Sequence, residues 1–200
     1  MTKQDFDEIT SQYKLMDLLA ENSTNQVKKL LKTFSCKISN DLQDFLHNKA
    51  ITFERNLRSR TYLYANNENK GIVAYFTLAI NYLETDKFKS EIIQILSGYA
   101  SYTDYTDKTN AIPCYLIGQL AIRDEYRKQG IGNFLLTDAL KIADNAQTSF
   151  GGRFVLIDSV NNDKVINFYE QNSFIALEND KSLKSIKMIK PYFECDELKF

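Results

Sequence analysis

The sequence predicts one α/β or α+β domain built on a β-sheet with flanking helices. In the second half, apolar runs of strand length at 115–122 and 154–160 alternate with helical patterns at 132–146 and 163–171. This order indicates a sheet covered by helices and excludes a helical bundle or a β-sandwich. The length of 200 residues suits a single domain over 1–200, because no linker, repeat or low-complexity tract divides it.

The other elements follow from capping residues and hydrophobic spacing. The expected helices are one from the capping residues 22–25 to Lys32, one capped by Ser39 or Asn40 and carrying Leu42, Phe45, Leu46, Ala50 and Phe53 at helical spacing, and a short one at 89–96. The expected further strands are 13–20, 61–65, 72–80, 174–177 and 186–189. A polar, tyrosine-rich loop at 99–105 would form one wall of a substrate cleft.

Composition excludes several classes of protein. With 25 Lys and Arg against 26 Asp and Glu, the net charge is −1, so no overall field would collect nucleic acid or an anionic membrane, although a local basic patch stays compatible with this balance. Cys36, Cys114 and Cys195 are far apart and His47 is the only histidine. We therefore expect no disulfide framework and no zinc site, and interpret His47 as a surface or half-buried helix residue. No signal peptide or membrane span is recognisable, which predicts a cytoplasmic protein.

One segment carries the chemistry, a strand that ends at Ile122, a basic loop and an amphipathic helix. The first N–H groups of a helix lack intrahelical partners and lie in positive potential. Gly130 and Gly132 let the backbone turn sharply and approach an oxygen-rich group, and Arg127 and Lys128 add charge. A diphosphate suits such a site. The alternative is a tight turn that needs glycine only for its geometry, and the pattern matches neither the dinucleotide fingerprint nor the Walker loop.

Two motifs in order resemble the GNAT superfamily of acetyltransferases. Arg127-x-x-Gly130-x-Gly132 resembles its Gln/Arg-x-x-Gly-x-Gly/Ala signature, and residues 162–174 resemble its fingerprint Asn-x-x-Ala-x-x-Phe-Tyr-x-x-x-Gly-Phe. Val165 and Ser173 replace the alanine and the last glycine of that fingerprint. A bacterial branch of the superfamily is similar upstream, at Phe34, Ser35, Cys36, Leu42, Phe45, Leu46, Ala50 and residues 60–63. The resemblance covers about 34–190 and is weakest across 81–112.

The resemblance implies a central mixed, mostly antiparallel sheet with a splayed strand pair, a cofactor-binding half at about 114–174 and an acceptor side at about 20–112. It implies acetyl-CoA as the acyl donor, whose pantetheine arm would pair with the backbone of Leu120, Ala121 and Ile122. The diphosphate would lie on the amides of Arg127, Lys128, Gln129, Gly130, Ile131, Gly132 and Asn133. Asn162 would hold the cofactor near its pantetheine end. Tyr169 would be the general acid for the leaving thiolate, the alternative being a packed aromatic side chain.

The implied reaction is acetyl transfer to a primary amine by direct attack on the thioester. We rank a small-molecule amine or a protein amino group ahead of aminoacyl-tRNA, which toxins of the bacterial branch acetylate. The reasons are the net charge and the acidic residues of the stretch expected to frame the acceptor, Asp86, Glu91, Asp104 and Asp107. A homodimer is compatible with the family, and a non-catalytic acyl-CoA sensor is a further alternative. Glu84, Asp158 and the carboxylates of 99–107 are candidate general bases, and none is assigned.

Overall fold

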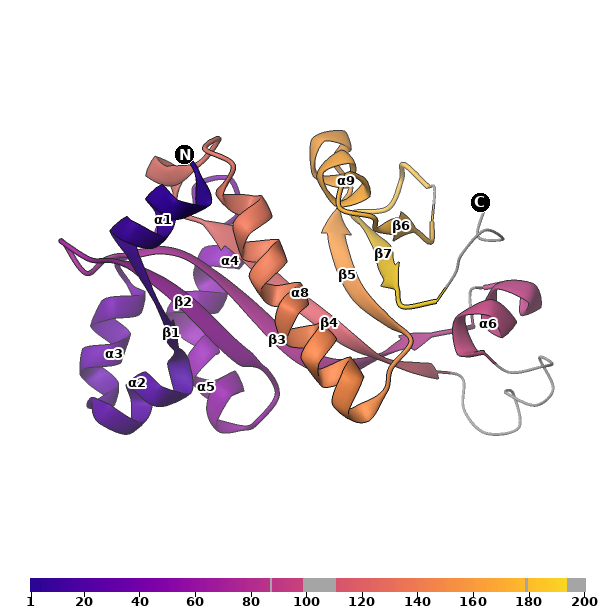
Figure 1. Ribbon diagram of the computed structural model, residues 1–200, viewed down its shortest axis with the longest axis horizontal. Helices are drawn as coiled ribbons and strands as arrows, with labels where there is room; N and C mark the ends of the chain where they lie inside the picture. The colour runs from indigo at the N-terminus through magenta and orange to yellow at the C-terminus, as the bar shows by residue number, and fades with distance from the viewer. Residues whose placement is uncertain (87, 99–110, 179, 194–200) are drawn as a thin grey trace. The chain divides into compact units, whose positions relative to one another are not determined.

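The computed structural model describes residues 1–86, 88–98, 111–178 and 180–193 (Figure 1). The chain forms two compact units. Unit 1 contains Met1–Ala79 and Ile117–Ile142, and unit 2 contains Ile80–Leu116 and Ala143–Phe200. Strands β3 (Ile72–Glu84) and β4 (Ala111–Ile122) and helix α8 (Ile131–Phe150) contribute residues to both. Within these described ranges, seven strands are hydrogen-bonded in the order β1-β2-β3-β4-β5-β7-β6, which confirms the predicted α/β sheet fold.

In unit 1, antiparallel strands lie between two sets of helices. Strand β1 (Thr10–Lys14) pairs with β2 (Arg60–Asn66), and β2 pairs with β3, with a register shift at Tyr64/Ala65. One face is covered by α2 (Leu15–Glu21), α3 (Thr24–Leu31), α4 (Asn40–Asp44), the π-helical turn η1 (Phe45–Lys49) and α5 (Ala50–Arg55). On the other face, α1 (Lys3–Ile9) places the Phe6 ring 5.4 Å from that of Tyr64 and 5.9 Å from that of Phe134 in α8.

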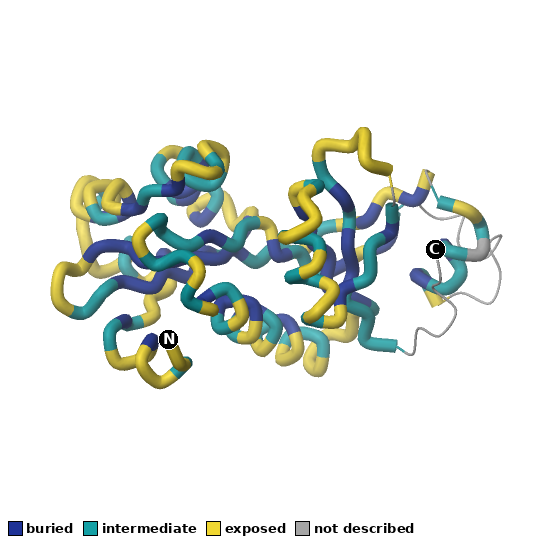
Figure 2. Tube along the Cα trace, turned by 90° about the horizontal axis from the view of Figure 1, so that it is seen from above, coloured by how far each residue is buried: buried dark blue, intermediate teal, exposed yellow. Residues whose placement is uncertain are grey.

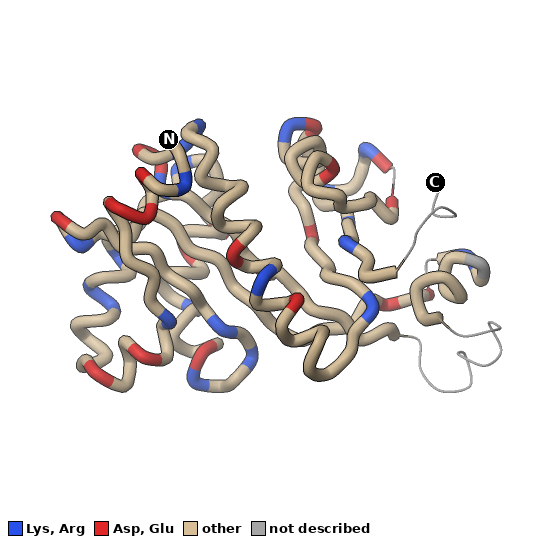
Figure 3. The backbone as a smooth tube through the Cα atoms, viewed as in Figure 1, with Lys and Arg blue, Asp and Glu red and all other residues tan. Residues whose placement is uncertain are grey.

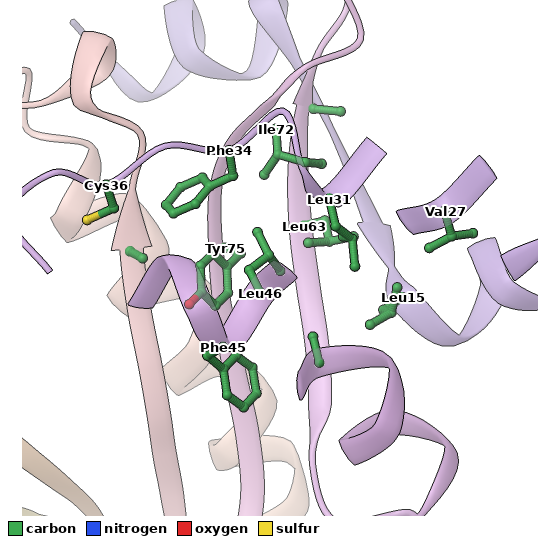
Figure 4. Close-up of a cluster of buried hydrophobic side chains, with 13 residues drawn as sticks. Leu15, Val27, Leu31, Phe34, Cys36, Phe45, Leu46, Leu63, Ile72 and Tyr75 are labelled. Atoms are coloured by element: carbon green, nitrogen blue, oxygen red, sulfur yellow. The ribbon is translucent and has the colours of Figure 1, made fainter. Parts of the chain in front are cut away.

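The core of unit 1 explains why these helices form where they do. Apolar side chains of α2, α3 and η1 meet Leu63 and Tyr75 of the sheet, and each of these two strand residues is fully buried (Figure 4). The Tyr75 hydroxyl donates to the Leu42 carbonyl across 2.6 Å, so its buried polar atom is paired. Strands β2 and β3 are buried along most of their unit 1 residues, whereas the helices are exposed on their outer sides (Figure 2).

Unit 2 contains the antiparallel pair β5 (Phe154–Val160) and β7 (Ser185–Pro191), with the short β6 (Ile175–Ala176) beside β7. Helix α9 (Asp163–Glu170) lies against β5 and β6, and α6 (Ser90–Ser97) packs Ile93 and Leu96 into the core. The Arg153 guanidinium closes the end of α6, because Nε and Nη2 donate to the Leu96 and Ile95 carbonyls at 2.9 and 3.0 Å.

Three local predictions were wrong or incomplete. The expected strand at 13–20 ends at Lys14, and Leu15, Leu18 and Leu19 instead place a helical apolar face on the core. Helix α1, capped by Thr2 and Asp5, was not predicted. The helix after Ser39 is interrupted by η1. The other expected helices and strands are present within a few residues, and the loop at 99–105 lies outside the described residues.

Candidate active site

The predicted anion site lies in unit 1, between the end of β4 and the start of α8. The Arg123 amide donates to the Val73 carbonyl across 2.8 Å, and the short 3-10 turn η2 (Asp124–Tyr126) follows. Arg127 is extended, whereas Lys128 and Gly130 have φ of 60° and 81°. The left-handed conformation at Lys128 was not predicted from the sequence, and it is sterically costly for a residue with a Cβ atom. Residues 127–133 are called the cradle below.

Five consecutive backbone amides of the cradle, those of 128–132, donate no hydrogen bond to any described residue. The next amide donor, Asn133, reaches the Gly130 carbonyl across 3.1 Å. Successive N–H groups around a left-handed residue form a concave anion site, and the start of α8 adds its own unpaired amides and dipole. A polar backbone of this kind needs water or a bound anion as its partner.

The cradle is open and positively charged. A Cβ atom at Gly130 would meet no heavy atom within 4 Å, so a ligand can approach the backbone there. Arg127 is half-buried and Lys128 is exposed. Of the three predicted strand residues, Ala121 is buried in the core, and Leu120 and Ile122 are half-buried. The structure therefore brings residues 120–122 and the cradle together in one unit.

Asn162 and Tyr169, the other two predicted site residues, lie in unit 2. The Asn162 side-chain oxygen caps α9 by accepting from the Lys164 amide across 3.1 Å. Tyr169 lies in the last turn of α9, and its ring packs edge-on against Phe168 and Phe174, with centroids 5.0 and 5.5 Å away. Burial raises the pKa of Tyr169 to about 12, and its hydroxyl has no hydrogen-bond partner among the described residues. The phenol is therefore protonated and available as a donor.

The candidate general bases gain no support from their surroundings. Glu84 and Asp158 are exposed, and Asp158 lies 4.0 Å from the Lys187 ammonium. The carboxylates of 99–107 lie outside the described residues. His47 is half-buried, with Nε2 2.9 Å from the Phe34 carbonyl, as expected of a structural histidine. In the described part of the chain, no three His, Cys, Asp or Glu side chains are grouped to hold a metal.

A hollow of about 300 Å³ in unit 1 contains none of the predicted site residues. It lies between β1, α2 and α3 and is mainly apolar, lined by Leu18, Val27, Leu30 and Ala65, with Tyr13, Asn22, Gln26 and Lys70 around them. Asn22 and Gln26 are engaged in helix ends, so the hollow brings no catalytic set of polar groups together. We do not assign the chemistry to it.

Comparison with known proteins agrees with the motifs. Residues 27–174 match the acetyltransferase (GNAT) family. The chain belongs to this family. As a GNAT protein it is an acyltransferase whose acyl donor is acetyl-CoA, and the match includes both the cradle and the α9 fingerprint. No curated protein matches the sequence significantly.

Solved structures with the same fold cover nearly the whole chain. AtaT complexed with acetyl-methionyl-tRNAfMet is 21% identical, with a TM-score of 0.66 over 91% of this GNAT protein and 94% of AtaT. The AtaTR structure bound with AcCoA is 20% identical, with a TM-score of 0.63 over 92% and 94%. A tyrosine-to-phenylalanine mutant of KacT is 17% identical, with a TM-score of 0.67 over 92% and 95%. At these identities the similarity establishes the fold.

Proposed function

We propose that this GNAT protein transfers the acetyl group of acetyl-CoA to a primary amine by direct attack of the amine on the thioester. The observation that carries the proposal is the row of five amides at 128–132, beside Arg127 and Lys128, that donate to none of the described residues. These groups fit a diphosphate, which brings several oxygen acceptors and negative charge to one place.

Each predicted site residue has a role in this proposal. The cradle amides hold the diphosphate, and the backbone of 120–122 pairs with the pantetheine arm. The family fingerprint assigns Asn162, whose side chain is exposed at the start of α9, a contact with the cofactor near its pantetheine end. Tyr169 donates a hydrogen bond to the thiolate sulfur as it leaves. The roles of Asn162 and Tyr169 rest on the resemblance of 162–174 to the family fingerprint.

The proton balance defines what Tyr169 does. The attacking amine forms the new C–N bond and releases one proton, the C–S bond breaks, and the thiolate takes one proton up. A thiol has a pKa of about 8.5, well below the pKa of about 12 of Tyr169, so full proton transfer from the phenol alone is uphill. Tyr169 therefore acts best as a relay, which gives its proton to the sulfur and recovers one from the amine.

Calorimetric titration with acetyl-CoA tests the cradle. We compare the unchanged protein with Gly130→Asp, whose carboxylate would point into the anion site. Gly151→Asp is a matched control, because Gly151 also has a positive φ, of 77°, and open space around its Cβ position, but lies after α8 in unit 2. We expect binding by the unchanged protein and by Gly151→Asp, and at least a tenfold weaker affinity for Gly130→Asp because of charge repulsion and blocked amides.

The outcomes separate the alternatives. Absence of binding by the unchanged protein would reduce the cradle to a turn, and the proposed function would fall with it. An equal loss of acetyl-CoA affinity in Gly130→Asp and Gly151→Asp would indicate that the substitutions destabilise the fold rather than block the cradle.

Aminoacyl-tRNA is a second candidate acceptor, favoured by the charge of unit 1. Although the whole chain has a net charge of −1, residues 24–60 carry eight basic side chains against three acidic ones. Basic residues recur along α3 (Figure 3). Lys28, Lys29 and Lys32, at the end of this helix, are exposed and form no ion pair with a described residue. Such a basic group suits a phosphate backbone. The shared fold with AtaT, which has been solved with acetyl-methionyl-tRNAfMet, supports the same candidate.

An acceptor screen with acetyl-CoA, peptides, polyamines and charged tRNA distinguishes the two candidates. If charged tRNA is the acceptor, reversing Lys28, Lys29 and Lys32 to Glu should lower its acetylation at least tenfold and weaken its salt dependence. Acetylation of a peptide should not change. Reversal of Lys89, Lys181 and Lys184, three exposed lysines of unit 2, to Glu changes the total charge by the same amount and is the control. Acetylation of peptides or polyamines alone would reject tRNA and retain the first candidate.

The proposed setting is the bacterial cytoplasm, where acetyl-CoA and charged tRNA are both available. Its support is the upstream resemblance at 34–63 and the fold shared with a structure named as a bacterial toxin. No helix in the described ranges is long and apolar enough to cross a bilayer.

A further inference from the structure

Segment 34–37 has no regular secondary structure, yet four of its backbone groups are held by other parts of unit 1. His47 Nε2 lies 2.9 Å from the Phe34 carbonyl, and the Cys36 amide donates to the Gln43 side chain across 3.0 Å. Both partners come from the helical stretch α4–η1. The segment is therefore fixed from one side by the helices of the proposed acceptor side.

Asp124 fixes the same segment from the other side. Its two carboxylate oxygens each lie 3.1 Å from the Lys37 amide, and its own amide donates to the Ser35 carbonyl across 3.2 Å. Asp124 begins the turn η2, and its carbonyl accepts from the Arg127 amide at 3.4 Å. One residue thus bonds to segment 34–37 and to the first residue of the cradle.

Cys36 lies within electrostatic range of the same two residues, Asp124 and Arg127. Its thiol is buried, and burial is the main cause of its raised pKa, with smaller electrostatic contributions from both Asp124 and Arg127. Segment 34–37 therefore lies beside the cradle entrance. Segment and cradle are both in unit 1.

The charge of Asp124 needs an explanation. A carboxylate three residues before a diphosphate site repels the ligand, so its electrostatic effect on binding is unfavourable. The neighbouring Glu125 carboxylate is exposed and pairs only with Arg123, at 3.3 Å, among the described residues. The contacts of Asp124 with Ser35 and Lys37 are the feature that distinguishes it.

We propose that Asp124 is a positioning residue, which holds segment 34–37 against the entrance of the cradle and thereby sets the affinity for acetyl-CoA without touching it. The proposal rests on the proposed function, since it assumes that the cradle binds acetyl-CoA. It joins the acceptor-side helices to the cofactor site through one carboxylate.

The test compares three variants by calorimetry and steady-state kinetics. Asp124→Ala removes the acceptor of the Lys37 amide, Asp124→Asn keeps an acceptor oxygen and removes the charge, and Glu125→Ala removes a neighbouring charge alone. We expect Asp124→Ala to raise the Kd and the KM for acetyl-CoA about tenfold with kcat nearly unchanged, as for a lost charged hydrogen bond. Asp124→Asn and Glu125→Ala should bind as tightly as the unchanged protein or more tightly.

Amide hydrogen exchange at Lys37 provides the structural readout. Protection should be lost in Asp124→Ala and kept in Asp124→Asn. Lys37→Pro removes the donor of the same hydrogen bond and should weaken acetyl-CoA binding to a similar extent. In the double variant with Asp124→Ala, it should weaken binding little further. Lys37→Pro also replaces Asp124→Ala in the test if Asp124→Ala does not fold.

Two results would overturn the inference. In the first, Asp124→Ala loses protection at Lys37 but binds acetyl-CoA normally. In the second, Asp124→Ala tightens binding as Glu125→Ala does, which would make charge the whole effect. Failure of the unchanged protein to bind acetyl-CoA would instead reject the proposed function.

Discussion

Tyr169 shows how packing prepares a single side chain for a chemical role. Its ring is enclosed by Phe168 and Phe174, and the resulting desolvation disfavours the phenolate. The hydroxyl therefore stays protonated at pH values above 10, the approximate pKa of a free tyrosine. A donor at the leaving sulfur must be protonated at working pH, and this environment secures that state.

Tyr169→Phe should lower kcat at least tenfold and leave the affinity for acetyl-CoA within about twofold, because the ring packing remains and only the donor is lost. Calorimetry and initial rates measure the two quantities. In the unchanged protein, kcat should not fall between about pH 9 and 11 through ionisation of Tyr169, since its pKa of about 12 lies above this range. Unchanged turnover in Tyr169→Phe would refute the relay. A protein that binds acetyl-CoA but acetylates no acceptor would be the sensor.

At the scale of elements, the end of α9 explains a departure from the family fingerprint. Ser173 occupies the position of the usual glycine and adopts a φ of 66°. Its amide donates to the Glu170 carbonyl across 2.9 Å, and the Phe174 amide donates to the Tyr169 carbonyl across 3.0 Å. The helix thus ends in a left-handed residue that returns the chain to the core. Serine in place of glycine therefore raises the conformational free energy of this turn but leaves its backbone geometry unchanged.

Ser173→Gly should stabilise the protein by about 0.5–1 kcal/mol. Glycine adopts the left-handed conformation without steric cost, and its greater conformational entropy in the unfolded chain offsets part of that gain. Urea denaturation measures the change. Ser149→Gly makes the same chemical change within the helix α8 and should destabilise by a similar amount. If Ser173→Gly were also destabilising, relief of the positive φ at Ser173 would not outweigh the entropy that glycine gains in the unfolded chain.

The whole molecule buries tyrosines in both units. Burial raises the pKa of Tyr64 and Tyr75 in unit 1 and of Tyr169 and Tyr192 in unit 2. It also raises the pKa of the Cys114 thiol to about 12. In each case the folded state binds the proton more tightly than the unfolded chain does. The stabilising contribution of the tyrosines is therefore complete below about pH 9 and declines as the pH rises past their unfolded pKa of about 10. The contribution of Cys114 begins to decline earlier, near the unfolded thiol pKa of about 8.5.

The urea midpoint should accordingly be lower at pH 10.5 than at pH 8. Because the chain has 12 tyrosines and no tryptophan, tyrosinate absorbance reports ionisation without interference. Tyr169→Phe should make the fall smaller, whereas Tyr82→Phe, at a 64% exposed position, should not. A midpoint that stays constant over this pH range would contradict the prediction.

Features that depend only on neighbouring residues could be predicted from the sequence. Strand–helix alternation after residue 111, the Ser23 and Ser39 helix caps and the glycine-bearing loop all appear where the pattern placed them. Hydrophobic periodicity and helix capping depend on residues a few positions apart, so both can be recognised in the sequence alone. The same holds for the match of two spaced motifs to the GNAT family.

Tertiary structure decided the rest. Leu15 to Leu19 form a helix rather than a strand, because their apolar side chains reach the core beside Leu63 only in helical geometry. Asp124 meets Lys37 across a sequence separation of 87 residues, which no local pattern encodes. Lys128 adopts a left-handed conformation that its own propensity opposes, and this conformation helps leave the cradle amides unpaired. Contacts between distant segments set the first two features, since their combined free energy exceeds local preferences of about 1 kcal/mol per residue.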